Sequence, residues 1–273
     1  MKAVAQSLVL VLVFMGSIFG QHLEEEHKEI NAHVVAVFPS ADTLPANLLR
    51  MYVHFSRPMK PVGNLEKIHL VDDSGKEMVG ALFNNVYELW NREQTQLTLL
   101  LDPARVKTGL KAHEERGRAL EAGQRYALVI GQLEDIHGNV TPPHTKSFWV
   151  SSEDLNSPDV QRWTIEVPEV GSRAPLTVSF PQILDRLSLL QRVKLTDANR
   201  RPVTGSVELA SQETGWLFRP SERWVAGDYI LHIHGRLEDP AGNNLNGLFD
   251  HQPGTLRNDT EGAIETITFK LLQ

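Results

Sequence analysis

Short runs of strand-forming residues recur along most of the chain, and several of them alternate apolar with polar positions. Successive side chains of a β-strand point to opposite faces, so this alternation is typical of strands with one buried face. Turn-forming clusters such as Asp72-Asp73-Ser74-Gly75 and Asp197-Ala198-Asn199 separate the runs. The predicted strands are residues 34–38, 51–55, 97–101, 126–130, 163–167, 176–180, 193–196 and 229–233. The chain is therefore predicted to be almost entirely β.

The sequence also repeats itself, which indicates one fold written twice. Residues 122–139 align with residues 226–243 at an offset of 104, and 8 of these 18 positions are identical. Further upstream the offset is 125, where Val53-His54-Phe55 matches Val178-Ser179-Phe180. The change of offset assigns about 21 extra residues to the first repeat, most of them around 107–120.

Two repeats of about 110 residues, built from short strands and frequent turns, predict two tandem immunoglobulin-like β-sandwiches. We assign residues 1–20 to a signal peptide, 21–30 to an acidic N-terminal segment, 31–150 to domain 1, 151–162 to a linker and 163–273 to domain 2. The linker is polar and punctuated by proline, so we expect it to impose little rigidity and to leave the two domains in modest contact.

The first twenty residues have the order of a secretory signal peptide. Lys2 precedes an apolar run at residues 8–15, and small residues lead to Gly20, the predicted cleavage point. The alternative is an uncleaved anchor, but the run is shorter than the roughly 20 residues that a spanning helix needs. We therefore expect a soluble exported protein, secreted or periplasmic, with no membrane span after cleavage.

Composition narrows the classes of partner and chemistry. With 27 basic and 34 acidic residues, the net charge is −7, so no nucleic-acid partner is expected. The absence of cysteine excludes disulfide frameworks, Cys-zinc sites and thiol catalysis. Each sandwich must therefore be stabilised by packing alone.

Several blocks of the chain resemble a known family. They are Phe38-Pro39-Ser40-Ala41-Asp42, Val53-His54-Phe55-Ser56-Arg57-Pro58-Met59, Leu120-Glu121-Ala122-Gly123-Gln124-Arg125-Tyr126 and Asp135-Ile136-His137-Gly138-Asn139. The chain resembles the bacterial Ig-like domains first described in surface-layer proteins (the SbsA-type), well over 31–150 and moderately over 163–273, where residues 178–184 lack the Ser-x-Pro-Met part. The resemblance implies the fold and an extracytoplasmic setting. It carries over no catalytic residue.

Three short motifs with possible chemistry have simpler interpretations. Asp73-Ser74-Gly75 matches the loop of aspartic proteases, but the second repeat has Asp197-Ala198-Asn199 there, so we interpret it as a turn. His113-Glu114-Glu115-Arg116-Gly117 lacks the second histidine of a zincin site. Residues 22–27, with His22 and His27, are interpreted as a solvated acidic tail.

His232 and His234 lie two residues apart on a predicted strand and would face the same side. Zinc would need a third ligand such as His54, Asp250 or His251, and nothing in the sequence brings one near. The aligned positions of the first repeat are apolar, so we interpret the two histidines as replacements of packing residues. No metal is predicted.

The turns Asp135–Asn139 and Asp239–Asn243 are the best repeated polar feature. Calcium is one interpretation, but each turn offers fewer oxygens than the six to eight that calcium takes. A hairpin turn explains every residue, with the aspartate capping backbone amides and Gly-Asn supplying positive φ. We therefore predict a structural role.

No nucleophile elbow, P-loop or dinucleotide motif appears, and no catalytic residue or cofactor is predicted. We expect a non-enzymatic protein with a structural or binding role and an unidentified protein or glycan partner. Residues 107–118 and 244–262 are its predicted working surfaces. The alternative is a carbohydrate-active or hydrolytic protein, which would need exposed aromatic residues near paired carboxylates. The candidate aromatic residues are Tyr87, Trp90, Trp216 and Trp224. A monomer is expected, although the protection of the sheet edges is not readable from sequence.

Overall fold

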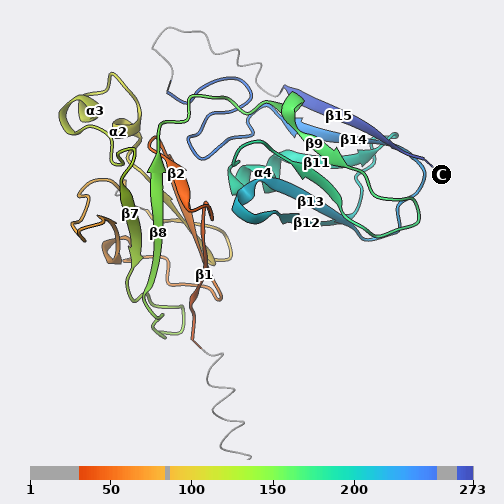
Figure 1. Ribbon diagram of the computed structural model, residues 1–273. Coiled ribbons are helices and arrows are strands. Elements are labelled where there is room, and N and C mark those ends of the chain that lie inside the picture. Colours follow the sequence, from red (N-terminus) through yellow and green to blue (C-terminus); the bar gives the residue numbers. More distant parts are fainter. Residues whose placement is uncertain (1–30, 84–86, 251–262, 273) are drawn as a thin grey trace, which may run out of the picture.

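The computed structural model describes residues 31–83, 87–250 and 263–272. The prediction of two tandem immunoglobulin-like β-sandwiches is confirmed (Figure 1). In the first sandwich one sheet has the order β1 (Val34–Phe38), β3 (Arg50–Phe55), β6 (Gln96–Leu100) and β5 (Leu89–Trp90). The facing sheet has the order β2 (Thr43–Pro45), β8 (His144–Ser151), β7 (Arg125–Ile130) and β4 (Ile68–Asp72).

The second sandwich repeats this plan with one strand fewer among the described residues. Its four-stranded sheet has the order β12 (Gly205–Leu209), β13 (Gly215–Pro220), β10 (Leu176–Ser179) and β9 (Thr164–Glu166). Its three-stranded sheet has the order β11 (Val193–Asp197), β14 (Gly227–His234) and β15 (Ile264–Leu271). All pairings in both sheets are antiparallel.

The helices of the described chain are short. They are η1 (Leu65–Lys67), α2 (Pro103–Val106), α3 (Lys111–Arg116), η2 (Val160–Arg162), α4 (Arg186–Arg192) and η3 (Ser211–Glu213). The first turn of α2 is stabilised by Pro103 and by Asp102, whose carboxylate accepts a hydrogen bond from the Ala104 N–H. None of the described helices combines the length and the apolar character needed to cross a membrane.

Each sandwich encloses its own hydrophobic core. Alternate residues of the strands point inward, as the strand period requires; Leu128 and Phe148 belong to the first core, and Trp216 and Leu231 to the second. The core residues of the first cluster all precede residue 151, apart from Ile183, which packs against it from the second half of the chain. The two cores are thus separate, and hydrogen bonds and an ion pair join the sandwiches between them.

The segment predicted to be a linker is held by hydrogen bonds on both sides. The Asp154 N–H donates to the Asn47 side chain at 2.9 Å, and the Asn47 amide donates back to the Asp154 carbonyl at 2.9 Å. The same carbonyl accepts a third hydrogen bond, from the Asn243 amide of the second sandwich, at 2.9 Å. Because these contacts tie the segment to both sandwiches, its polar composition does not make it a free tether.

Candidate functional site

The two sandwiches meet along a buried polar contact that we call the seam. Its residues are Ser40, Leu49, Arg50 and Tyr52 from the first sandwich and Asp185, Glu213, Glu238 and Pro240 from the second. Buried polar groups are costly unless they are hydrogen-bonded. Each charged group of the seam bonds to a group on the other sandwich, so these contacts are satisfied in one relative arrangement of the two sandwiches.

Tyr52 lies at the centre of the seam and is 1% exposed. Its hydroxyl donates to Asp185 Oδ2 at 2.7 Å, while Asp185 Oδ1 accepts from the Ser188 N–H and caps α4. Burial, together with the negative charge of Asp185, raises the pKa of the Tyr52 hydroxyl far above its ordinary value. The hydroxyl therefore remains a donor at every physiological pH.

A second contact pairs opposite charges beside a backbone hydrogen bond. Arg50 Nη2 lies 2.6 Å from Glu238 Oε2, and both side chains are about a quarter exposed. The neighbouring Leu49 N–H donates to the Pro240 carbonyl at 2.9 Å. Truncating one partner of such a pair would leave the other charge half-buried and unpaired, which is strongly unfavourable.

Glu213 forms the third contact and has a strained backbone. Both Gln212 and Glu213 have positive φ, 59° and 52°, a conformation that residues other than glycine rarely adopt. This turn directs the buried Glu213 carboxylate to the Ser40 N–H at 2.8 Å, and the Gln212 N–H donates to Ser40 Oγ at 3.1 Å. The strain is thus accompanied by two hydrogen bonds across the seam.

The repeated Asp-x-x-Gly-Asn turns have the same hydrogen bonds in both sandwiches. In each turn the aspartate accepts from the N–H and the side-chain amide of the asparagine, and the glycine has positive φ (86° at Gly138, 80° at Gly242). These are the contacts expected of a structural turn.

The two aspartates nevertheless differ in their electrostatics. Burial, reinforced by the nearby Asp154 carboxylate, raises the pKa of Asp239 to about 8. At Asp135 burial acts in the same direction, but hydrogen bonds from Asn139 and His137 outweigh it and hold the pKa below its ordinary value. The two aspartates of the repeated turn therefore have pKa values shifted in opposite directions.

The two predicted working surfaces contact one another. The N–H and hydroxyl of Thr108 both donate to Asp250, each at 3.1 Å, and Arg118 pairs with Glu153 and lies 3.6 Å from Asp250. Lys107 Nζ lies 4.5 Å from the centre of the Phe249 ring. Residues 251–262 of the second surface lie outside the described residues. The described part of these loops links the sandwiches, and a recognition role for them stays a prediction.

Arg105 holds the backbone of the first of these loops, residues 107–118, in place. Its buried guanidinium donates to the carbonyls of Gly80, Arg116, Gly117 and Arg118, at 2.8–3.4 Å. His113 Nδ1 lies 2.7 Å from the carbonyl of Arg105. His113 therefore supports the loop backbone.

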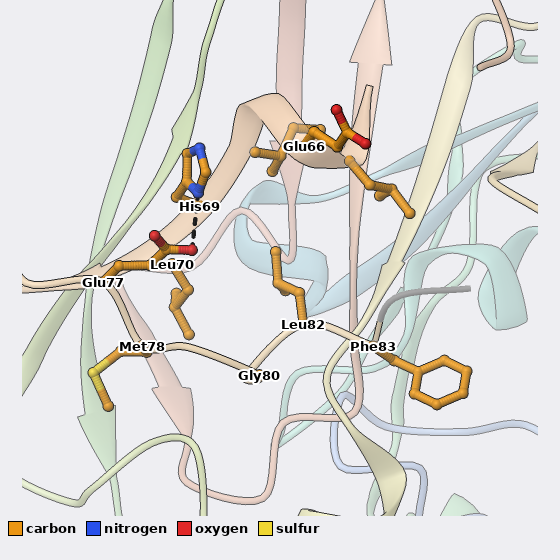
Figure 2. Close-up of a pocket in the computed structure, with 10 residues that line it drawn as sticks. Glu66, His69, Leu70, Glu77, Met78, Gly80, Leu82 and Phe83 are labelled. Atoms are coloured by element: carbon orange, nitrogen blue, oxygen red, sulfur yellow. Dashed lines mark hydrogen bonds and ion pairs between the residues drawn. The ribbon is translucent and has the colours of Figure 1, made fainter. Parts of the chain in front are cut away.

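A surface pocket of about 170 Å³ opens beside β4 on the first sandwich (Figure 2). Apolar side chains including Leu70, Met78 and Leu82 line it, and Figure 2 shows Glu66 and the hydrogen-bonded pair of His69 and Glu77 at its rim. His69 Nδ1 and Glu77 Oε1 are 3.0 Å apart, and about half of each side chain is exposed to solvent. A shallower hollow of about 520 Å³ shares Glu66 and His69, so the concave surface continues along this side.

The structure contradicts our interpretation of His232 and His234 as packing residues. Both are half-buried, while their neighbours Leu231 and Ile233 are fully buried. The aligned stretch slips by one residue within the strand, and a one-residue slip moves a side chain to the opposite face of a sheet. His232 Nε2 contacts the Thr196 hydroxyl at 2.9 Å, and His234 Nδ1 accepts from the Arg236 N–H at 3.1 Å.

The other candidate motifs have local contacts. Asp72, beside the Asp73-Ser74-Gly75 motif, accepts from the N–H and hydroxyl of Ser74 and from the Lys76 N–H, as in a tight turn. No cluster of three metal-ligating side chains occurs in the part of the chain that the structure describes. His22, His27 and His251 lie outside that part.

The aromatic candidates for sugar binding differ in exposure. Trp216 and Trp224 are buried in the second core, and Trp90 packs partly buried against Phe55 with its indole N–H on Glu88. Tyr87 is 81% exposed, close to the pocket wall formed by Phe83. The tryptophans thus serve packing, and Tyr87 alone of the four candidates is fully available to a ligand.

Comparisons with known proteins bear on the fold alone. No protein-family model and no curated protein sequence matches the chain. Among solved structures, the chain is similar to the N-terminal part of the bacterial S-layer protein SbsC, at 11% identity over 75% of this chain and 41% of that one, with a TM-score of 0.33. CopC from Methylosinus trichosporium OB3b matches at 18% identity over 46% of this chain and 100% of that one, with a TM-score of 0.31.

A chimeric titin Z1Z2 structure is similar over 89% of this chain and 93% of that one, at 12% identity and a TM-score of 0.27. The chain spans about two fifths of the SbsC structures that it matches, at 41–42% of their length. At such identities and scores, function has to be argued from the residues of this chain.

Sequence reasoning missed both the seam and the pocket. Tyr52 and Asp185 are 133 residues apart, and nothing in either local pattern connects them. A signal for the pocket did exist, because His69 and Glu77 flank the predicted turn at Asp73-Ser74-Gly75. A hairpin through that turn places the two side chains near one another.

Proposed function

We propose that this chain is an exported, non-enzymatic protein of tandem Ig-like modules, similar to the SbsA-type domains of surface-layer proteins. It acts at the cell envelope or outside the cell. The proposal includes the signal peptide at residues 1–20 and the module boundaries at 31–150 and 163–273. The two modules are held in one arrangement, and the first presents a binding surface around the pocket beside β4.

The seam is the observation that carries this proposal. Tyr52, Asp185 and Glu213 are buried, and each is hydrogen-bonded to the opposite sandwich. Groups used in this way hold two modules together and are closed to a substrate. The accessible side chains with binding chemistry lie instead at the pocket, where an apolar floor meets the His69–Glu77 pair.

Ligand arrays test the binding role. Wild-type protein is applied to glycan and peptide arrays beside His69→Ala, which removes one rim group of the pocket. The matched control is His232→Ala, which removes a half-buried strand histidine of the second sandwich. We expect saturable binding that His69→Ala weakens at least tenfold and His232→Ala leaves unchanged. Equal binding by all three proteins would place the surface elsewhere.

The same proteins test the hydrolytic alternative. A panel of chromogenic glycosides and esters is incubated with wild type and with His69→Ala. We expect no turnover above the buffer rate. Turnover by wild type that is lost in His69→Ala would overturn the non-enzymatic assignment and make the His69–Glu77 pair a candidate acid–base group.

A further inference from the structure

The sheet edges of the two sandwiches are unequally protected. β1 carries a bulge, β2 contains Pro45, and β5 and β9 have two and three residues. The edge of β4 is covered by a returning segment, since the Met78 N–H donates to Leu70 O and the Asp72 N–H to Lys76 O. These are the usual means by which proteins prevent edge-to-edge association.

The edge of β11 is covered in the same way. The Val203 N–H donates to the Leu195 carbonyl at 3.1 Å, and the Asp197 N–H to the Arg201 carbonyl at 3.0 Å. β15, at the other border of the same sheet, has no such cover in the described chain (Figure 1). β12, which borders the four-stranded sheet, is also uncovered among the described residues, but it has five residues against the eight of β15. β15 pairs with β14 over all eight of its residues without a bulge, and it contains no proline.

The register fixes which groups of β15 are open. The Gly235 N–H donates to the Ala263 carbonyl, so the odd-numbered residues from 263 bond to β14. The N–H and C=O groups of Ile264, Thr266, Thr268 and Lys270 therefore point away from β14. Within the described residues none of these backbone groups has a hydrogen-bond partner.

The side chains of β15 suit pairing with an identical strand. In an antiparallel pair with a two-fold axis, opposing residues lie on the same face of the sheet. With the axis at Ile267, Thr266 opposes Thr268 of the second molecule and Lys270 opposes its Ile264, while Glu265 opposes Phe269. No like charges meet, and threonine pairs are favourable across strands.

We propose that β15 forms an intermolecular antiparallel strand pair with β15 of a second molecule, joining two three-stranded sheets into one. This pairing is independent of the pocket on the first sandwich. A single strand pair is a small interface, so the dimer forms reversibly and depends on protein concentration. This proposal differs from the monomer that we expect from the sequence alone.

Sedimentation velocity of the full chain from low to high micromolar concentration tests the pairing. Thr268→Pro removes an outward N–H and leaves the hydrogen bonds to β14 intact, while Thr268→Val keeps the N–H at nearly the same shape. We expect wild type and Thr268→Val to shift toward dimer as concentration rises, and Thr268→Pro to require at least tenfold more protein. Wild type that stays monomeric throughout overturns the proposal.

A second variant covers the case in which Thr268→Pro fails to fold. Thr266→Lys combined with Thr268→Lys sets lysines opposite lysines in the pair, and both side chains are exposed in the monomer. We expect this double variant to be monomeric with an unchanged thermal melt. A double variant that dimerises as readily as wild type would mean that the dimer forms through another surface.

Discussion

From the raised pKa of Asp239 we predict how the stability of the folded protein changes with pH. The carboxyl is 1% exposed, and its folded-state pKa is about 8, against an ordinary value of 3.8. Between these values the folded protein holds a proton that the unfolded chain has released. Stability from this group is therefore present below pH 4 and is lost progressively as the pH rises toward 8.

The magnitude follows from the linkage relation. Each pH unit within this window costs about 1.4 kcal/mol for one proton. From pH 6.5 to 8.5 the loss tapers as Asp239 itself ionises, which leaves about 2 kcal/mol. Burial also lowers the pKa of His54, which changes stability in the opposite direction over part of the range. Comparison with an Asp239→Asn variant cancels that contribution, because both proteins contain His54.

Urea unfolding at pH 6.5, 7.5 and 8.5 measures the effect. The free energy of unfolding of wild type, relative to Asp239→Asn, should fall by about 2 kcal/mol across these values. Asp135→Asn is the matched control, because Asp135 occupies the same turn of the first sandwich and its pKa is lowered. Its difference from wild type should stay constant. An Asp239→Asn difference that is equally flat would refute the reasoning.

Three further changes probe the seam and its surroundings. Gly242→Ala should lower stability by about 1–3 kcal/mol more than Gly138→Ala in thermal melts. Both glycines have positive φ, but only the Cβ added at Gly242 would lie 2.7 Å from Leu49. Equal losses of stability would contradict the packing argument. Tyr52→Phe should cost about 1.5–3 kcal/mol in urea unfolding through its lost hydrogen bond to a carboxylate, and a loss below 0.5 kcal/mol would speak against it. Arg105→Met should speed tryptic cleavage within residues 107–118, since four carbonyls lose their donor; unchanged cleavage would contradict the supporting role.

The eight predicted strands were accessible from sequence because period-two patterns and the internal repeat are local signals. β15 had the same signal, with Ile267, Phe269 and Leu271 at alternate positions, yet it was overlooked. β8 was harder to predict, because its burial alternates along the whole strand but only Phe148 and Val150 are apolar at the inward positions. The fold thus followed from periodicity. The missed strands include short ones such as β2 and β5, and also β4 and β13, whose apolar residues the prediction did not use.

The seam was not predictable in the same way. Its contacts join residues more than 130 positions apart, such as Tyr52 with Asp185 and Ser40 with Glu213. A tyrosine in a strand and an aspartate before a helix each have a sufficient local explanation. The slip at His232 shows a related limit, because identical flanking residues set the alignment and one extra residue in the strand changed the face.

Our central claim is that the seam fixes the arrangement of the two sandwiches. The distance between the sandwiches tests it most directly. The chain has no cysteine, so spin labels attach only at introduced ones. Ser147→Cys on β8 and Ser206→Cys on β12 place one label on each sandwich at exposed positions. Pulsed electron–electron double resonance at low protein concentration then reports the distribution of distances between the two labels within one molecule. We predict a single narrow distribution that broadens when Tyr52→Phe is added. A broad distribution in the labelled protein with an intact seam would contradict the account.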